Sequence, residues 1–172
     1  MKKWEIILWG DPRLEAPNTS VEVFDEALFQ LTEEMFSTCH RAPGLGLAAP
    51  QIGLNIRLTV LDLSIGRDPA QKIVLANPHI IEHSGSTTLE EGCLSFPGLF
   101  THIPRPRKIV VLGQDLSGKE IRVEGEELLA QALCHELDHL DSILLIHHLK
   151  GLKRRMFLKK VEKLRKAGHW KR

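Results

Sequence analysis

The chain has 172 residues, of which 42% are hydrophobic and 26% charged, with a net charge of +1 and three cysteines. This length and composition suit one domain with a sizeable core and exclude the disordered, fibrous and disulfide-rich classes. No apolar run is long enough to cross a bilayer, and the first ten residues lack the long apolar segment and cleavage site of a signal peptide. We therefore expect a single domain over residues 1–172, in the reducing compartment of the cytoplasm.

The first fifty residues predict a short strand and one helix. Apolar residues favour a strand over residues 4–8, and the turn residues Gly10-Asp11-Pro12 would end it. From Asp25 to Cys39, apolar side chains recur at helical spacing, and acidic residues open the first turn. That helix should end before Pro43, because proline disfavours helical backbone in the residue ahead of it.

A glycine-rich segment, GLGLAAPQ, occupies residues 44–51. It formally matches the loose dinucleotide-binding pattern G-x-G-x-x-A, but that motif needs a strand before it and a helix after it. Here a helix precedes the segment, and Pro50 would interrupt the helix that the motif requires. The better interpretation is that the glycines let backbone approach a ligand closely, with the side-chain amide of Gln51 as a donor nearby.

The middle of the chain predicts a series of β-strands. Runs rich in β-branched and apolar residues alternate with turn residues. The strands are expected over residues 55–63, 72–76, 79–83, 86–89, 108–112 and 120–123. Asn77-Pro78 is predicted to turn the chain, Ser84-Gly85 to join two antiparallel strands, and residues 115–118 to close a hairpin.

The strongest motif is His135-Glu136-Leu137-Asp138-His139, an H-E-x-x-H sequence in a helix expected over residues 126–140. Histidines four residues apart lie on one face of a helix, so both imidazoles can reach one metal ion. Glu136 follows the first histidine directly, which lets its carboxylate reach a metal-bound water without acting as a ligand. A buried helix would otherwise carry these charges at a high desolvation cost.

The residues alone leave the third metal ligand open. A metzincin would need a histidine at the position of Leu145, so that class fails. Glu162 lies in a lysine-rich segment, where a solvated ion pair is the commoner role, and His147 and His148 are candidates on spacing alone. Cys93 remains, although a small buried apolar role is commoner for a cysteine.

A last helix is predicted over residues 148–166. Residues 150–172 hold eleven lysines and arginines against one acid, whereas the preceding 149 residues hold twelve against twenty-one. A basic tail on an acidic body indicates contact with a polyanion, and a solvated helix face is the alternative. Together the elements predict an α+β domain, with mixed or antiparallel strands around a central H-E-x-x-H helix, an N-terminal helix and a basic C-terminal helix.

Three segments in order resemble the motifs of peptide deformylase: residues 44–51, EGCLS at residues 91–95, and HELDH at residues 135–139. The resemblance extends from Gly10 to Leu145. It implies that the metal is bound by one cysteine and two histidines, which here are Cys93, His135 and His139. The chain departs from the family pattern at Cys134, Ser142 and the pair His147-His148, which puts the hydrogen bonding around the ligands in question.

The resemblance also implies the chemistry. Such an enzyme removes the formyl group from the N-terminal formyl-methionine of new polypeptides. A metal-bound water attacks the formyl carbon, and Glu136 takes its proton and passes it to the leaving amine. The Gln51 amide and the Leu94 backbone N–H would face the developing oxyanion. The family favours Fe²⁺ as the native metal, while the ligand types also admit Zn²⁺, Ni²⁺ or Co²⁺.

An apolar pocket is expected for the methionine side chain. Its candidate lining combines two residues of the H-E-x-x-H helix with one from each of the other two motifs. These residues are Leu45, Leu89, Leu128 and Ala132. The peptide backbone is expected to pair with extended chain near Gly46.

The basic tail gains a partner from the same resemblance. In bacterial deformylases of this length, a C-terminal helix docks on ribosomal RNA near the exit tunnel, and no membrane or DNA partner is expected. The matching contacts here would be Lys153, Arg154, Arg155, Lys159 and Lys160. Two rival functions remain: a general H-E-x-x-H metallopeptidase, and a catalytically silent ribosome-associated protein.

Overall fold

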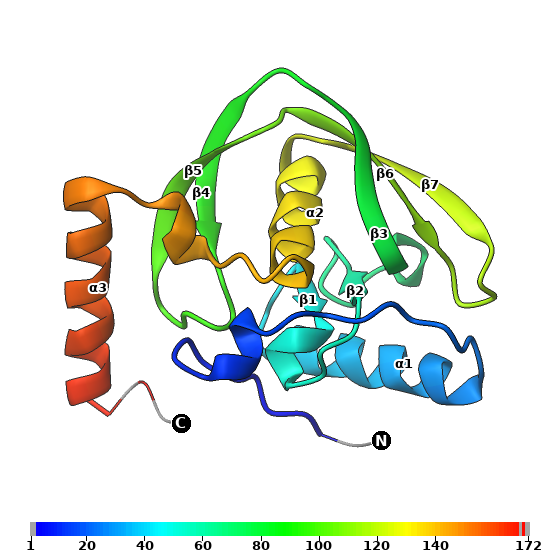
Figure 1. Ribbon diagram of the computed structural model, residues 1–172, viewed down its shortest axis with the longest axis horizontal. Coiled ribbons are helices and arrows are strands. Elements are labelled where there is room, and N and C mark those ends of the chain that lie inside the picture. Colours follow the sequence, from blue (N-terminus) through cyan, green and yellow to red (C-terminus); the bar gives the residue numbers. More distant parts are fainter. Residues whose placement is uncertain (1–2, 169, 171–172) are drawn as a thin grey trace.

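The computed structural model describes residues 3–168 and Trp170, and its central element is helix α2 (Glu127–Leu140). Figure 1 shows α2 with β4 (Thr87–Gly92) and β5 (Phe100–Arg105) on one side and β3 (Ile73–Ser84) and β6 (Lys108–Gln114) on the other. The remaining strands are β1 (Gly46–Ala48), β2 (Leu58–Leu61) and β7 (Glu120–Glu126). Helix α1 (Glu26–Arg41) packs against β1 and β2, and α3 (Gly151–Lys166) lies at the far side of β4 and β5.

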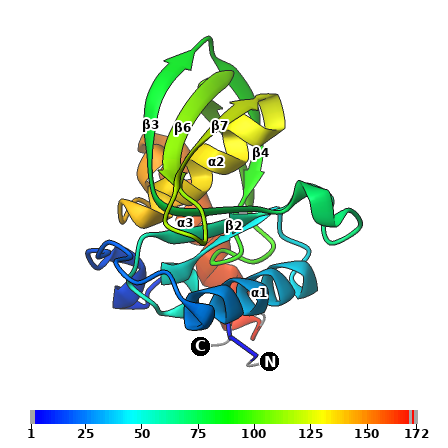
Figure 2. The same cartoon turned by 90° about the vertical axis from the view of Figure 1, so that its right-hand side faces the viewer.

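Two antiparallel sheets enclose α2. Five strands form one sheet in the order β1-β2-β3-β6-β7, and β4 pairs with β5 in the other. The side view in Figure 2 shows β3, β6 and β7 side by side above α1. This is a single α+β domain, as the sequence predicted. No helix among residues 3–168 has the length and apolar content of a membrane span.

Helix α1 confirms the predicted N-terminal helix. The Asp25 side chain caps it by accepting a hydrogen bond of 3.0 Å from the Leu28 N–H, and the apolar face buries Met35 and Phe36. The helix ends at Arg41, two residues before Pro43. It therefore leads directly into the glycine-rich segment.

The predicted strand at residues 4–8 is wrong. This segment has no regular structure and belongs to neither sheet. Ile7 donates to the Gln51 carbonyl at 2.8 Å and Trp9 to the Ser95 carbonyl at 3.0 Å. The apolar side chains pack on two different core clusters, so the segment is held by burial and scattered hydrogen bonds without a ladder.

The predicted turn at Asn77-Pro78 is also wrong, because β3 runs through both residues. Asn77 adopts a left-handed backbone (φ 52°), and the pairing of β3 with β6 shifts register between Ala76 and His79. The irregularity is a bulge inside a strand. Asn and Pro are common in turns and also occur at bulges, so these residue types alone do not separate the two.

The antiparallel pair expected around Ser84-Gly85 does not form. At Gly85 (φ 66°) the chain leaves the five-stranded sheet, and β4 pairs with β5 instead of β3. Strands β1 and β5 were not predicted from the sequence. The hairpin of β6 and β7 about residues 115–118 is confirmed, with the Asp115 carboxylate accepting from the Ser117 N–H at 2.8 Å.

The C-terminal helix begins later than predicted. Residues Leu145–His148 form a 3₁₀ turn, and α3 starts at Gly151. Phe157 and Val161 are buried against Leu14 and Phe96, so α3 belongs to the core of the domain. Residues 1–2, 169 and 171–172, which include part of the predicted basic tail, lie outside the described residues.

Asn77 offers a test of the bulge. Its side-chain oxygen accepts from Val21 N at 2.8 Å, and its amide donates to the Val21 carbonyl at 2.9 Å and to Gln114 Oε1 at 2.7 Å. Asn77→Gly should lose these bonds and about 2 kcal/mol of unfolding free energy, while keeping the backbone angle. Asn77→Ala should lose about 1 kcal/mol more, because its Cβ opposes the left-handed conformation. Urea denaturation measures both, and equal losses would contradict the strain argument.

Candidate metal centre and substrate cavity

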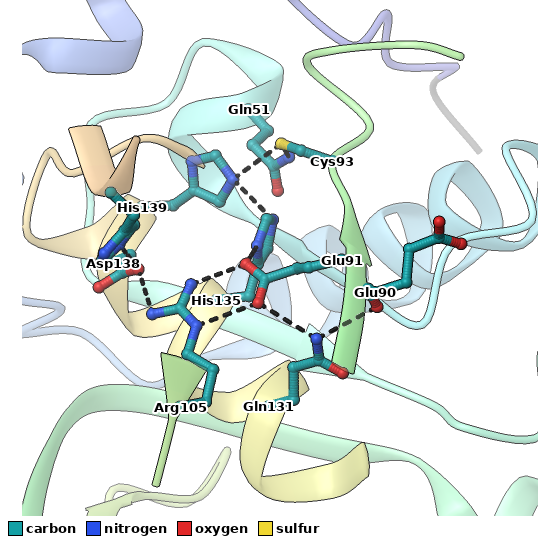
Figure 3. Close-up of polar contacts among 10 residues, drawn as sticks. Gln51, Glu90, Glu91, Cys93, Arg105, Gln131, His135, Asp138 and His139 are labelled. Atoms are coloured by element: carbon teal, nitrogen blue, oxygen red, sulfur yellow. Dashed lines mark hydrogen bonds and ion pairs between the residues drawn. The ribbon is translucent and has the colours of Figure 1, made fainter. Parts of the chain in front are cut away.

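Three potential metal ligands converge where α2 meets the turn after β4. His135 and His139 lie one helical turn apart, with their Nε2 atoms 3.2 Å apart. The Cys93 sulfur lies 3.3 Å from His139 Nε2, and the donor atoms of all three residues lie within 4.8 Å of one another (Figure 3). The turn that carries Cys93 is closed by a 2.8 Å hydrogen bond from Phe96 N to the Cys93 carbonyl.

The Glu91 carboxylate fixes the orientation of the first histidine. His135 Nδ1 lies 2.7 Å from Glu91 Oε1. Since a carboxylate only accepts, Nδ1 carries a proton, and in the neutral imidazole Nε2 is then the atom that can bind a metal. Glu91 opens the EGCLS motif, but the sequence alone indicates no role for its carboxylate.

Arg105 on β5 holds Glu91 in turn. Its Nη2 donates to Oε1 at 2.7 Å and its Nε to Oε2 at 3.0 Å, and both side chains are almost fully buried. Burial alone would raise the pKa of Glu91, but the hydrogen bonds from His135 and Arg105 outweigh it and lower that pKa to about 2. Sequence reasoning missed Arg105, and nothing in its local sequence marks it.

The cluster fits a divalent transition metal ion. One cysteine and two neutral imidazoles are a usual ligand set for zinc and related ions, and the three ligand atoms here lie close to one another. Two neighbouring buried atoms, Glu136 Oε2 and His139 Nδ1, have no hydrogen-bond partner among the described residues. Lone pairs and an orphaned carboxylate oxygen in one buried spot would be costly without a cation to compensate them.

The other ligand candidates are engaged elsewhere. His147 Nε2 pairs with Glu15 at 3.1 Å, and His148 Nε2 pairs with Asp138 at 2.7 Å. Glu162 forms an exposed ion pair with Lys166 at 3.0 Å. Of the four candidates left open by the sequence, Cys93 is the one that lies at the histidine pair.

Glu136 is buried beside the cluster, and burial raises its pKa to about 7. Gly46 on β1 packs directly against it. A Cβ at position 46 would lie 2.6 Å from Glu136 Oε1, which no side chain can do without displacing the carboxylate. The glycine-rich segment therefore makes room for Glu136.

Gln51 and Leu94 lie beside Cys93, in the lining of the same cavity as Glu136. The Gln51 Oε1 accepts a 2.9 Å hydrogen bond from Ala48 N, and its Nε2 lies 3.4 Å from Ser95 Oγ. The same Nε2 lies 3.7 Å from Cys93 Sγ, and Figure 3 shows the two side chains next to each other. Within the described part of the chain, the backbone N–H of Leu94 donates to no protein acceptor. The Leu94 N–H is thus free to donate to a ligand, whereas Gln51 Nε2 would give up its long contacts with Cys93 and Ser95 to do the same.

A cavity of about 550 Å³ opens beside the cluster. Four of the five predicted substrate residues line it: Leu45, Gly46, Leu128 and Ala132. Leu89 does not; it is half-buried in β4, opposite Ile103. The cavity also has lining residues that the sequence analysis did not single out, including Gln131 and Phe100. The sequence could have indicated Gln131, because its amide lies four residues before His135 and therefore on the same face of the helix.

Comparison with known proteins agrees with this geometry. The family model described as polypeptide deformylase matches residues 3–155. The peptide deformylase of Acidobacterium capsulatum is 45% identical over 165 residues, which cover 96% of this chain and 97% of that protein. The peptide deformylase of Hydrogenovibrio crunogenus is 45% identical over 163 residues, covering 95% of each.

A solved structure agrees as well. The crystal structure of a peptide deformylase from Legionella pneumophila superposes with a TM-score of 0.91 at 39% identity, covering 99% of this chain and all of that one. The match thus extends over the three motifs, the central helix and both sheets. This chain belongs to the polypeptide deformylase family.

Proposed function

We propose that this enzyme hydrolyses the formyl amide at the N-terminal formyl-methionine of newly made polypeptides, using a metal ion bound by Cys93, His135 and His139. The observation that carries the proposal is the convergence of these three ligands beside a cavity that also holds Glu136. An ion bound there supplies Lewis acidity, which lowers the pKa of a coordinated water toward neutrality. Fe²⁺ is the proposed native metal, and Zn²⁺, Ni²⁺ and Co²⁺ also suit these ligands.

Glu136 acts as the general base and then as the general acid. Its Oε2 is buried without a partner, so it is available to take a proton from the attacking water. The same carboxyl group then gives this proton to the amine nitrogen as the C–N bond breaks, and formate leaves. Proton transfer of this kind contributes about 10²–10⁴-fold in rate.

Gln51 and Leu94 stabilise the charge that develops on the formyl oxygen. The Gln51 amide is held by Ala48 N, and the Leu94 N–H has no competing acceptor among the described residues. Donors that are oriented in advance need no reorganisation during the reaction.

The cavity binds the methionine side chain, and the edge of the sheet binds the peptide. Leu45 and Ala132 supply apolar lining, and Leu128, which is 43% exposed, lies where the cavity meets solvent. Strand β1 is the last strand at one end of its sheet, so its outer edge can pair with an extended peptide.

A general metallopeptidase and a silent binding protein remain the rival functions. A peptidase would cleave an unformylated peptide, and a silent protein would release no formate. Incubating the metal-loaded enzyme with formyl-Met-Ala-Ser and with Met-Ala-Ser, while measuring formate and free amines, separates all three.

Glu136→Gln tests the catalytic role. The variant keeps the shape of the side chain but cannot take a proton, so formate release should fall by about 10²–10⁴-fold. Metal content by elemental analysis should stay at the level of the parent, because Glu136 is not a ligand. Formate release at the parent rate would show that another base is used.

Glu91→Gln tests the support of His135. Removing this buried charge should weaken metal affinity by about 10–100-fold, as with other partners of ligating histidines. Competition with a chelator measures the affinity, and Glu90→Gln, on the same strand, is the control. Parent-like affinity in Glu91→Gln would refute the role of this hydrogen bond.

The basic face of α3 is proposed to bind ribosomal RNA, in keeping with a cytoplasmic enzyme that acts on nascent chains. Its five predicted contact residues are all exposed. Deleting residues 150–172 would remove Phe157 and Val161 from the core, so charge reversal is the cleaner test.

The double variant Lys159→Glu/Lys160→Glu should weaken ribosome cosedimentation. If both lysines contact phosphates, the salt dependence of binding should also fall, by about 1 in slope for each. Arg67→Glu/Lys119→Glu changes the same total charge at exposed sites elsewhere and should bind like the parent. Equal loss in both variants would indicate a non-specific charge effect, and no loss in either would favour a merely solvated face.

A further inference from the structure

A continuous series of hydrogen bonds leads from the metal ligand His135 to the protein surface. Beyond Glu91, Arg105 also donates from Nη1 to Asp138 Oδ2 at 2.7 Å (Figure 3). The same Asp138 oxygen lies 2.7 Å from His148 Nε2. Each link is thus as short as a charge-assisted hydrogen bond.

His148 is the solvent-facing end of this series. Side-chain exposure is 10% or less for His135, Glu91 and Arg105, and it rises to 20% at Asp138 and 29% at His148. Because the Asp138 carboxylate only accepts, His148 Nε2 must be the protonated donor. The orientation of this ring is therefore set by the same network as that of His135.

The charges around Arg105 explain what the hydrogen bond from His148 does. Arg105 is the single cation shared by two carboxylates, Glu91 and Asp138. A carboxylate that lost one of its two donors would compete more strongly for the remaining one. Without His148, Asp138 would draw Arg105 away from Glu91, and Glu91 is what holds His135 in the geometry of a ligand.

We propose that His148 is a positioning residue for the metal centre: its hydrogen bond to Asp138 keeps Arg105 on Glu91 and thereby keeps His135 directed at the ion. This inference rests on the proposed metal-binding role of Cys93, His135 and His139. His148 is not among the residues that line the cavity, so its effect reaches the metal without touching the substrate.

The test compares three variants loaded with Co²⁺. His148→Leu removes the donor, and His148→Gln replaces it, because the glutamine Nε2 can occupy the place of the imidazole Nε2. His83→Leu removes an exposed histidine on β3 and serves as the control. The main measurement is the rate at which Co²⁺ passes to an excess of chelator, followed by loss of the cobalt–thiolate absorption.

His148→Leu should release Co²⁺ about 10-fold faster than the parent, at the low end of the effects of outer hydrogen-bond partners. His148→Gln and His83→Leu should release it close to the parent rate. On formyl-Met-Ala-Ser, kcat of His148→Leu should fall while KM stays unchanged. Urea unfolding of the metal-free proteins separates this role from general destabilisation, which would shift the midpoint without changing release.

Parent-like release in His148→Leu would overturn the proposal, as would equally fast release in both His148 variants, since the loss would then be one of packing. Cobalt release is measured without substrate. A protein that retains Co²⁺ as expected but frees no formate would therefore contradict the proposed reaction and leave the role of His148 intact.

Discussion

The buried carboxylate of Glu91 joins the two-stranded sheet to the central helix at the metal centre. It comes from β4, it is held by Arg105 from β5, and it orients His135 on α2. Its four hydrogen bonds, one of them from Gln131, occupy both oxygens. A buried carboxylate that is saturated in this way cannot rotate without losing several bonds at once. The fixed carboxylate therefore holds the His135 imidazole in the orientation that metal binding requires.

The sequence could predict the parts of the site that depend on local geometry. Histidines four residues apart on a helix must share a face, and they do. It could not predict Arg105 or the outcome for His148, because their partners lie 14 and 10 residues away in sequence and are reached through the β4–β5 pairing and the turn after α2. The strand errors have the same origin. Asn77 is a turn residue by type, yet its bonds to Val21, 56 residues away, hold it within a strand.

The glycine-rich segment illustrates how a weak local signal becomes specific in the fold. Alone, Gly46 permits close approach by any ligand. In the structure, Gly46 packs against Glu136, and any side chain at position 46 would collide with the Glu136 carboxylate. Gln51, five residues later, faces Cys93. Strand β1 thus leaves room for the Glu136 carboxylate, and the 3₁₀ turn Ala49–Ile52 after it places the Gln51 amide beside Cys93, as the proposed reaction requires. Gly46 and Gln51 reach these positions only because β1 pairs with β2 at the edge of the sheet.

The C-terminal helix takes part in the same construction. Phe96, three residues after Cys93, packs on Trp9 with ring centroids 5.8 Å apart and on Phe157 of α3 at 5.5 Å. The turn that presents the Cys93 sulfur is therefore clamped between the N-terminal segment and α3, and Arg165 closes the arrangement by stacking on the Trp9 ring at 5.0 Å. One face of α3 supports a metal ligand while its lysine-rich face remains in solvent. Substitutions on the basic face can thus leave the cysteine undisturbed, whereas substitutions on the apolar face would disturb the turn that carries it.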